Sequence, residues 1–271
     1  VEGLREVVKE QHVSELVLAP ADEITPALLR AVVTAHEGGV EVIRMATVYE
    51  RLLRRVPIDH LESDWVLTSL IDAMRLRDAS RLAKRALDIL GGCVGCVVFL
   101  FLLPIIGPAI WLDTGRPILF LQERVGLANR PFRLLKFRTM EQGAERAGPR
   151  WTGIRDPRVT RLGVFLRKSR LDEVPQFFNV VRGDMSLVGP RPERPEFVAE
   201  LEERIPFYRA RLLVRPGLTG WAQVNYRYGD TVADAAIKLE YDLYYIKRRT
   251  LLFDLAIAMR TVKTILTFAG R

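Results

Sequence analysis

The basic part of this 271-residue chain contains no histidine. All three histidines precede residue 78, at His12, His36 and His60. Residues 78–271 therefore offer no His-dependent triad and no histidine metal cluster. Serine occurs there only at Ser80, Ser169 and Ser186, and the G-x-S-x-G pattern is absent. Chemistry in this part must rest on carboxylates, arginine, lysine and a bound hard cation.

Cysteine and phosphate-binding glycine motifs are equally limited. The two cysteines form a C-x-x-C at Cys93 and Cys96 inside an apolar run, whereas a redox motif needs an electropositive, partly exposed site. We interpret both as small apolar residues. No G-x-G-x-x-G or G-K-[ST] occurs, so a dinucleotide site is not expected. No signal peptide is visible at the start, and we expect the chain to be part of a longer protein.

Charge is distributed unevenly. Of the 41 basic and 33 acidic residues, residues 1–77 hold 9 and 13, and residues 78–271 hold 32 and 20. The first part is therefore net −4 and the second net +12. This asymmetry predicts two units, the second facing nucleic acid, a phosphorylated substrate or lipid headgroups.

Residues 1–77 have an α/β pattern. Leu4–Gln11 is typical of a helix and Glu15–Pro20 of a strand. Thr25–Gly39 predicts a helix that ends at a glycine, and Val40–Ala46 predicts a second strand. This order and spacing predict a parallel crossover unit. Because two strands make a small sheet, we expect a partial accessory domain with a scaffold or regulatory role.

A long uncharged stretch follows. Ile89–Leu112 contains 24 residues without a charge, enough for a hydrocarbon core about 30 Å thick at about 1.5 Å per residue. A buried core helix is the alternative. The length, the glycines and the flanking Lys and Arg favour a membrane helix.

Prolines and flanking charges bear on how this helix meets the membrane. Pro104 and Pro108 interrupt its second half. Basic residues stand on both sides, at Arg81, Lys84, Arg85, Arg116, Arg124 and Arg130. Both flanks thus carry the cytoplasmic signature, which favours a helix–break–helix that enters and leaves on one face, while a spanning helix stays open. We therefore predict a re-entrant membrane helix over residues 78–114, kinked at Pro104.

Residues 115–271 predict a mainly helical, Arg-rich α+β body that is membrane-associated. From Leu251 onward, apolar positions recur at helical spacing, with Arg260 and Lys263 on the other face. This pattern fits either core packing or an interfacial amphipathic helix with snorkelling cations.

An acidic pair stands in basic surroundings. Asp172 and Glu173 lie within SRLDEVPQFFN, shortly after Arg167. One interpretation is a helix start, with Asp172 as N-cap, Glu173 at the positive end of the dipole and Pro175 in the first turn. The other is phosphoryl transfer, because an ionised aspartate can attack phosphorus directly and a second carboxylate can hold Mg²⁺. Arginines would then pair with phosphate oxygens.

Several long motifs in order carry a family resemblance. They are KFRTM (136–140), LRKSRLDEVPQFFNVVRGDMSLVGPRP (166–192), RPGLTGWAQVN (215–225) and YDLYYIKRRTLLFDL (241–255). They resemble the bacterial sugar transferase family, the monotopic polyprenyl-phosphate phosphoglycosyl transferases that initiate exopolysaccharide and O-antigen assembly. The resemblance covers about residues 80–271 and includes the re-entrant helix with its proline. Residues 1–77 resemble the second half of the Rossmann-like domain of larger members, which makes the chain a truncated large member.

The resemblance implies a two-step reaction. A sugar-1-phosphate moves from a UDP-sugar to polyprenyl (undecaprenyl) phosphate, with UMP leaving first and an aspartyl-phosphosugar intermediate forming. The lipid phosphate then displaces it. The resemblance further implies Mg²⁺, membrane lipids as partners and the cytoplasmic face of the bacterial inner membrane. It leaves the sugar undefined and a homodimer open.

By the same resemblance Asp172 is the nucleophile and Glu173 the magnesium ligand. Further substrate- or phosphate-binding positions that it implies are Lys136, Arg138, Arg167, Asp184, Arg191, Arg215, Arg227 and Asp242. Two departures stand out, because the loop after Asn225 is longer than in many members and Arg170 replaces a residue that is often a small hydroxyl residue. Some of these positions also have a purely structural interpretation, such as an ion pair between Arg182 and Asp184.

Three other functions compete with this one. A membrane-bound nucleotide-sugar phosphodiesterase would use water as acceptor. A membrane-anchored scaffold for polysaccharide assembly would have no activity. Nucleic-acid binding is not expected, since neither an exposed aromatic sheet nor a groove-sized basic helix is evident.

Overall fold

The structure is a computed structural model of the chain. It describes residues 7–8, 10–19, 25–58, 78–144, 148, 156–226, 229 and 231–266. Contacts divide the chain into two compact units, residues 1–63 and 64–271. The division falls within residues 59–77, which lie outside the described residues.

The first unit contains the predicted parallel crossover. Strand β1 (Glu15–Leu18) pairs in parallel with β2 (Glu41–Arg44), and helix α2 (Pro26–Glu37) connects them. Thr25 caps α2 by accepting a hydrogen bond from the Leu28 amide. The second strand is shorter than predicted, because helix α3 (Met45–Leu53) begins directly after it. Half of the predicted helix over Leu4–Gln11 lies outside the described residues, and Val7, Val8 and Glu10 are helical.

The second unit begins with the long helix α5 (Asp78–Thr114) and continues with a β-hairpin of β3 (Leu119–Val125) and β4 (Pro131–Phe137). A small parallel sheet pairs β5 (Ser186–Val188) with β6 (Gly217–Thr219). The remaining elements are η2 (Leu127–Asn129), α6 (Arg161–Lys168), η3 (Leu171–Gln176), α7 (Phe177–Arg182), α8 (Pro195–Arg204), η4 (Tyr208–Leu213), α9 (Trp221–Asn225), α10 (Val232–Arg248) and α11 (Leu251–Leu266).

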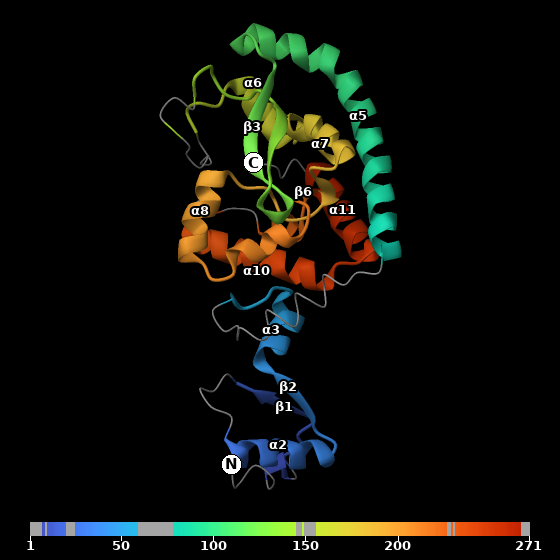
Figure 1. Cartoon of the computed structure of the whole chain (residues 1–271), viewed down its shortest axis with the longest axis vertical. Coiled ribbons are helices and arrows are strands. Elements are labelled where there is room, and N and C mark those ends of the chain that lie inside the picture. Colours follow the sequence, from blue (N-terminus) through green and yellow to red (C-terminus); the bar gives the residue numbers. More distant parts are fainter. Residues whose placement is uncertain are drawn as a thin grey trace. The chain divides into compact units, whose positions relative to one another are not determined.

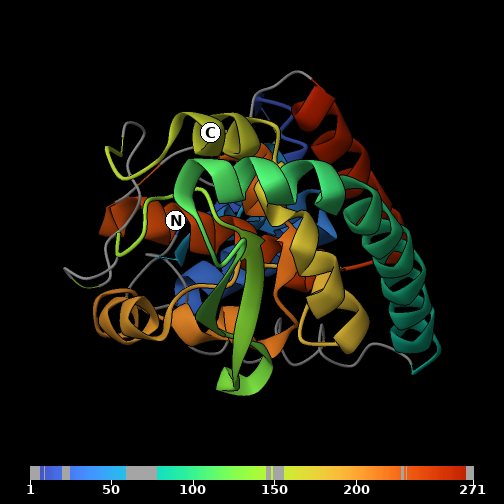
Figure 2. The same cartoon turned by 90° about the horizontal axis from the view of Figure 1, so that it is seen from above.

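Helix α5 is continuous, whereas a break was predicted. It includes both Pro104 and Pro108 without ending, and Figures 1 and 2 show it as a curved helix whose two ends run in different directions. A proline removes one helical hydrogen bond and bends the helix locally. The helix–break–helix is therefore absent, and a continuous, bent helix stands where a kink at Pro104 was predicted. Among the described residues, α5 alone is long and apolar enough to cross a membrane by length and composition.

Polar contacts join the first turns of α5 to α7 and β5 of the same unit. Asp88 is buried and accepts hydrogen bonds from the Ser186 hydroxyl at 2.9 Å and the Leu187 amide at 3.0 Å. Arg85 donates to the carbonyls of Val180 and Val181, both at 2.7 Å. Arg85, which the sequence suggested as a membrane-flanking cation, is thus committed to the C-terminal carbonyls of α7.

Glycines let α5 approach α7 closely. A Cβ atom at Gly95 would lie 2.1 Å from the Phe177 ring, and one at Gly92 would lie 2.8 Å from the Val181 side chain. The opposite face of α5 is apolar and exposed, for example at Phe101. Only 22% of its most apolar 18-residue window is buried. Within the described part of the chain, α5 is therefore not a buried core helix.

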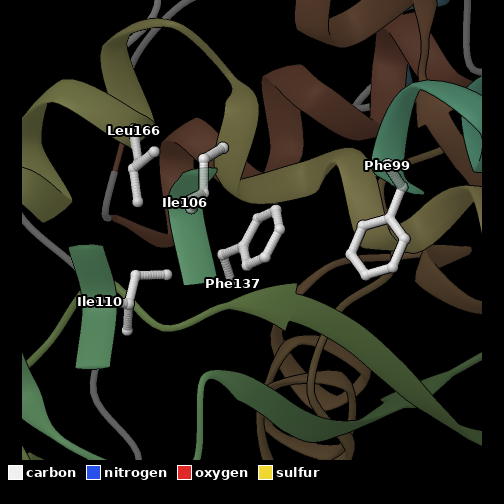
Figure 3. Packing of buried hydrophobic residues seen from close by; sticks show 5 residues of the cluster. All are labelled: Phe99, Ile106, Ile110, Phe137 and Leu166. Atoms are coloured by element: carbon white, nitrogen blue, oxygen red, sulfur yellow. The ribbon is translucent and has the colours of Figure 1, made fainter. Parts of the chain in front are cut away.

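A hydrophobic cluster behind the hairpin orients the strand that leads to the site. Figure 3 shows its five buried members, which come from α5, β4 and α6; they are Phe99, Ile106, Ile110, Phe137 and Leu166. The rings of Phe99 and Phe137 stack with centroids 5.5 Å apart. Because side chains alternate along a strand, burial of Phe137 directs its neighbours Lys136 and Arg138 to the other face of β4.

Candidate active site

The second unit contains a cavity of about 640 Å³ that is partly open to solvent. Its walls come from the β-hairpin, the segment after β4, η3, α8, η4, α9 and α10. The acidic side chains in its lining are Glu141, Asp172, Glu173, Glu193 and Asp242, and the basic ones include Arg124, Lys136, Arg138, Arg158, Arg167, Arg170, Arg191, Arg194, Arg211 and Lys238. The cavity is therefore a cationic chamber that contains an acidic pair.

A sharp turn brings the acidic pair to the cavity. Helix α6 ends at Lys168, and Arg170 then adopts a left-handed conformation (φ 58°) from which the 3-10 helix η3 starts. Asp172 and Glu173 occupy the first turn of η3, and each is only 7% exposed. The prediction that Asp172 is an N-cap is wrong, since Arg170 holds that position and no side chain caps this helix.

Glu173 is held by two arginines. Arg191 Nη2 donates to its Oε1 at 2.6 Å, and Arg170 Nη1 lies 3.5 Å from its Oε2. Burial raises the pKa of Glu173, but the charges of Arg191, Arg170 and Lys136 outweigh burial and keep that pKa well below its ordinary value. Glu173 is therefore an ionised carboxylate at any physiological pH. Arg170, whose role the sequence left open, forms the turn and pairs with Glu173.

Asp172 behaves differently from its neighbour. Burial, and then the negative charge of Glu173, raise the pKa of Asp172 to about 6. The charges of Lys136, Arg167 and Arg191 lower it only in part. These cations alone would keep the pKa of Asp172 low, but the desolvation of a buried carboxylate exceeds their attraction. Asp172 is nevertheless mostly ionised at neutral pH.

Three predicted cations reach the same chamber from different elements. Burial, followed by repulsion from Arg191 and Arg124, lowers the pKa of Lys136 to about 7. Arg167, at the end of α6, donates from Nε to the Thr139 hydroxyl at 2.9 Å. Nη1 of Arg138 is buried and has no hydrogen-bond partner within the described part of the protein. A buried guanidinium donor of this kind needs an acceptor such as an anionic oxygen.

Two predicted residues do not line the cavity. Asp184 forms an ion pair with Arg182 and accepts a hydrogen bond from Asn179 Nδ2 at 3.2 Å. Arg215 is exposed and donates from Nε to the Gly183 carbonyl at 3.0 Å. Both hold the turn after α7, so we do not assign them to the site. Arg227 lies outside the described residues.

Asp242 does reach the cavity, together with a partner that the sequence did not suggest. It is 1% exposed, and its Oδ2 lies 2.9 Å from Nη2 of Arg211. Burial raises the pKa of Asp242 to about 6, against the attraction of Arg211. No sequence feature distinguishes Arg211 from the surrounding arginines, because its burial depends on η4 and α10 packing together.

Comparison with known proteins decides the family. The sequence model of the family described as bacterial sugar transferase matches residues 79–268. The chain belongs to the bacterial sugar transferase family. The matched residues include all of the long helix except Asp78, and every described residue that lines the cavity.

The names of relatives of this chain specify different sugars. A protein of Aeromonas hydrophila, named UDP-N-acetylgalactosamine-undecaprenyl-phosphate N-acetylgalactosaminephosphotransferase, is 44% identical over 231 residues, which are 85% of this chain and 53% of the relative. A UDP-glucose:undecaprenyl-phosphate glucose-1-phosphate transferase of Caulobacter vibrioides is 41% identical over 217 residues, 79% of this chain and 81% of the relative.

Some relatives are much longer than this chain. An undecaprenyl-phosphate glucose phosphotransferase of Komagataeibacter xylinus is 41% identical over 194 residues, which are 69% of this chain but 36% of the relative. The chain thus spans about half or less of the Aeromonas and Komagataeibacter proteins.

Proposed function

We propose that this bacterial sugar transferase moves a sugar-1-phosphate from a UDP-sugar to undecaprenyl phosphate, releases UMP and so initiates polysaccharide assembly. The observation that carries the proposal is the buried pair of Asp172 and Glu173 in a chamber lined by cations. The unpaired Nη1 of Arg138 supports an anionic substrate there. The names of the relatives support the same reaction.

The chemistry follows from the ionised Asp172. In the first step one of its carboxylate oxygens attacks the phosphorus that bears the sugar. An O–P bond forms, the bond from that phosphorus to the bridging oxygen breaks, and UMP leaves with the electron pair. In the second step an oxygen of the lipid phosphate attacks the same phosphorus and releases Asp172 as a carboxylate. The cations of the chamber, Lys136 and Arg191 among them, offset the charge on the phosphoryl oxygens.

We further propose Mg²⁺ as the cofactor, with Glu173 as its protein ligand. Within the described residues no three His, Cys, Asp or Glu side chains gather. Mg²⁺ nevertheless fits, because it takes only one or two carboxylates from a protein and completes its shell with substrate phosphates and water. When bound, it would supply positive charge at the phosphates.

The proposed location is the cytoplasmic face of the bacterial inner membrane. Besides α5, helix α11 supports contact with lipid. It buries Asp254 and Ile257 but exposes apolar side chains on its other face, namely Leu252, Leu255, Met259 and Val262. This arrangement favours the interfacial interpretation of α11 over pure core packing.

We propose that α5 enters and leaves the membrane on the same side. Single cysteines at Leu82→Cys and Asp113→Cys, in a background without Cys93 and Cys96, flank the apolar stretch. Both should react with a membrane-impermeant maleimide in inverted vesicles, and neither should react in spheroplasts. Reaction of the two positions from opposite sides would show a spanning helix instead.

The function is tested by supplying nanodisc-embedded protein with a panel of UDP-sugars that includes UDP-N-acetylgalactosamine and UDP-glucose. We expect sustained UMP release and a lipid-linked sugar only when undecaprenyl phosphate is present. Without the lipid, UMP should be released once per active site, because the covalent intermediate has no acceptor. Sustained UMP release without lipid would indicate a phosphodiesterase. A lack of UMP release with every sugar would contradict the proposal.

A further inference from the structure

Hydrogen bonds to four consecutive backbone carbonyls hold the segment that carries Arg191. The carbonyls of Pro190, Arg191, Pro192 and Glu193 each accept a hydrogen bond from β3, η4 or β6 of the second unit. The donors are the Gly217 amide at 2.8 Å, Arg211 Nη2 at 2.8 Å, Arg124 Nη1 at 2.9 Å and the Val125 amide at 2.9 Å. A loop with four consecutive carbonyls fixed in this way has little freedom to shift.

Of the two side-chain donors, Arg211 is the more deeply buried, with 7% of its surface exposed. It has three partners. Its Nη1 donates to the Tyr208 hydroxyl at 2.6 Å, and its Nη2 donates to the Arg191 carbonyl. Its charge is balanced by Asp242, whose Oδ2 is 2.9 Å from Nη2 as an ion pair outside hydrogen-bond geometry. Although Arg211 borders the cavity, both of its terminal nitrogens are committed to protein groups.

Arg191 connects Arg211 to the acidic pair. Arg191 has its backbone fixed by Arg211, and its side chain donates to Glu173 at 2.6 Å. A guanidinium on a stem of three methylene carbons is otherwise free to adopt many rotamers, so fixing its backbone limits where its charge can lie. Groups that stabilise a phosphoryl transition state must be held close to their productive positions.

We infer that Arg211 is a positioning residue for the transfer reaction, which acts by holding Arg191 in place against Glu173, with Asp242 as its counter-ion and Tyr208 as its brace. The inference rests on the proposed function. It gives Asp242 a role that differs from substrate binding, because Asp242 balances a buried cation that would otherwise be costly to bury.

The test begins with Arg211→Lys, which keeps the positive charge beside Asp242 but cannot reach three partners with one ammonium group. We expect kcat to fall about 100-fold, as for a displacement of about 1 Å in a catalytic group, while KM for the UDP-sugar changes less than about threefold. Arg209→Lys is the matched control on the same η4, since Arg209 pairs with Glu202 on the surface. It should retain wild-type kinetics.

A double-mutant cycle with Arg191→Ala separates the possible roles. If Arg211 acts through Arg191, Arg211→Lys should cost less than about threefold once the Arg191 side chain is gone, because interacting residues are non-additive. A direct phosphate ligand would instead raise KM, and its cost would persist in the Arg191→Ala background. A purely structural residue would lower the fraction of active protein but leave kcat per active site unchanged. Either result would overturn the inference.

Tyr208→Phe keeps the test available if Arg211→Lys does not fold, since it removes only one hydroxyl. It should lower kcat about tenfold in the wild-type background. In the Arg191→Ala background it should lower kcat less than about threefold. Rates are counted per active site, titrated by the single release of UMP without lipid. Wild-type protein that turns over no UDP-sugar would refute the proposed function. Wild-type turnover with an additive cycle would refute only the role of Arg211.

Discussion

Asp172→Asn should abolish turnover and, in metal-free buffer, raise the thermal stability of the protein. The activity falls because the amide has no ionised oxygen to attack phosphorus, and we expect a loss of at least about 10⁴-fold. Protein incubated with a UDP-sugar radiolabelled in the sugar, without lipid, should trap label in wild type and none in the variant. The label should be stable to acid and released by hydroxylamine, as expected of an acyl-phosphate.

The stability change follows from the pKa of Asp172, which burial and then Glu173 raise to about 6 in the folded protein. A carboxyl with a raised pKa contributes stability only while it is protonated, and this contribution is lost as pH rises through about 6. At pH 7.5 the ionised Asp172 therefore destabilises the fold by on the order of 2 kcal/mol. Asn does not ionise, so Tm should rise by several degrees at pH 7.5 and by less at pH 5.

Asp184→Asn is the matched control for this experiment. Asp184 was also predicted as a site residue, but it lies outside the cavity lining and pairs with Arg182. The Asp184→Asn variant should keep near wild-type turnover and trap label normally. Wild-type turnover without any trapped label would instead indicate direct transfer, with Asp172 reassigned as a metal ligand.

Removal of divalent cations should stop the reaction almost completely. We expect turnover below about 1% after exhaustive chelation with EDTA, because the negative charges of Asp172, Glu173 and the diphosphate would repel one another without neutralisation. Mg²⁺ should restore turnover. Ca²⁺ should be a poor substitute, because it prefers more ligands at longer distances. Full activity after exhaustive chelation would show that no such cation is needed.

Glu173→Gln tests whether Glu173 is the ligand of the required Mg²⁺. We expect its half-saturating Mg²⁺ concentration to rise at least about tenfold, because Mg²⁺ prefers charged carboxylate oxygens. Calorimetric titration of Mg²⁺ in the presence of UDP would measure the change without relying on turnover. Glu193→Gln is the control, since Glu193 borders the same cavity but faces Arg124. An unchanged Mg²⁺ requirement in Glu173→Gln would remove Glu173 as a ligand.

Local features of the sequence determined much of the architecture. The crossover of β1, α2 and β2 was predictable because strand alternation, the Thr25 cap with Pro26 at the first helical position and the closing glycines act over a few residues. The long helix was predictable because 24 uncharged residues have few other solutions. The adjacency of Asp172 and Glu173 is a property of the chain itself.

Only the tertiary structure decided how these features are used. The pKa of Asp172 depends on how deeply η3 is buried, and burial has no local sequence signal. Arg85 became an anchor for the end of α7 because the glycine face of α5 packs there. Arg215 was left on the surface although its motif is as distinctive as that of Arg191.

Arg211 shows the same division most clearly. It is one of many arginines in a chain of net charge +8. Tyr208, three residues away, accepts a hydrogen bond from it, but its ion-pair partner lies far away in the sequence. Its acidic partner, Asp242, lies on α10, and its acceptor is a carbonyl of the segment after β5. The sequence alone determined which charges are available to this protein. Folding decided which of them are buried together. Burial strengthens the electrostatic interactions of a charged group, because little water remains to screen them.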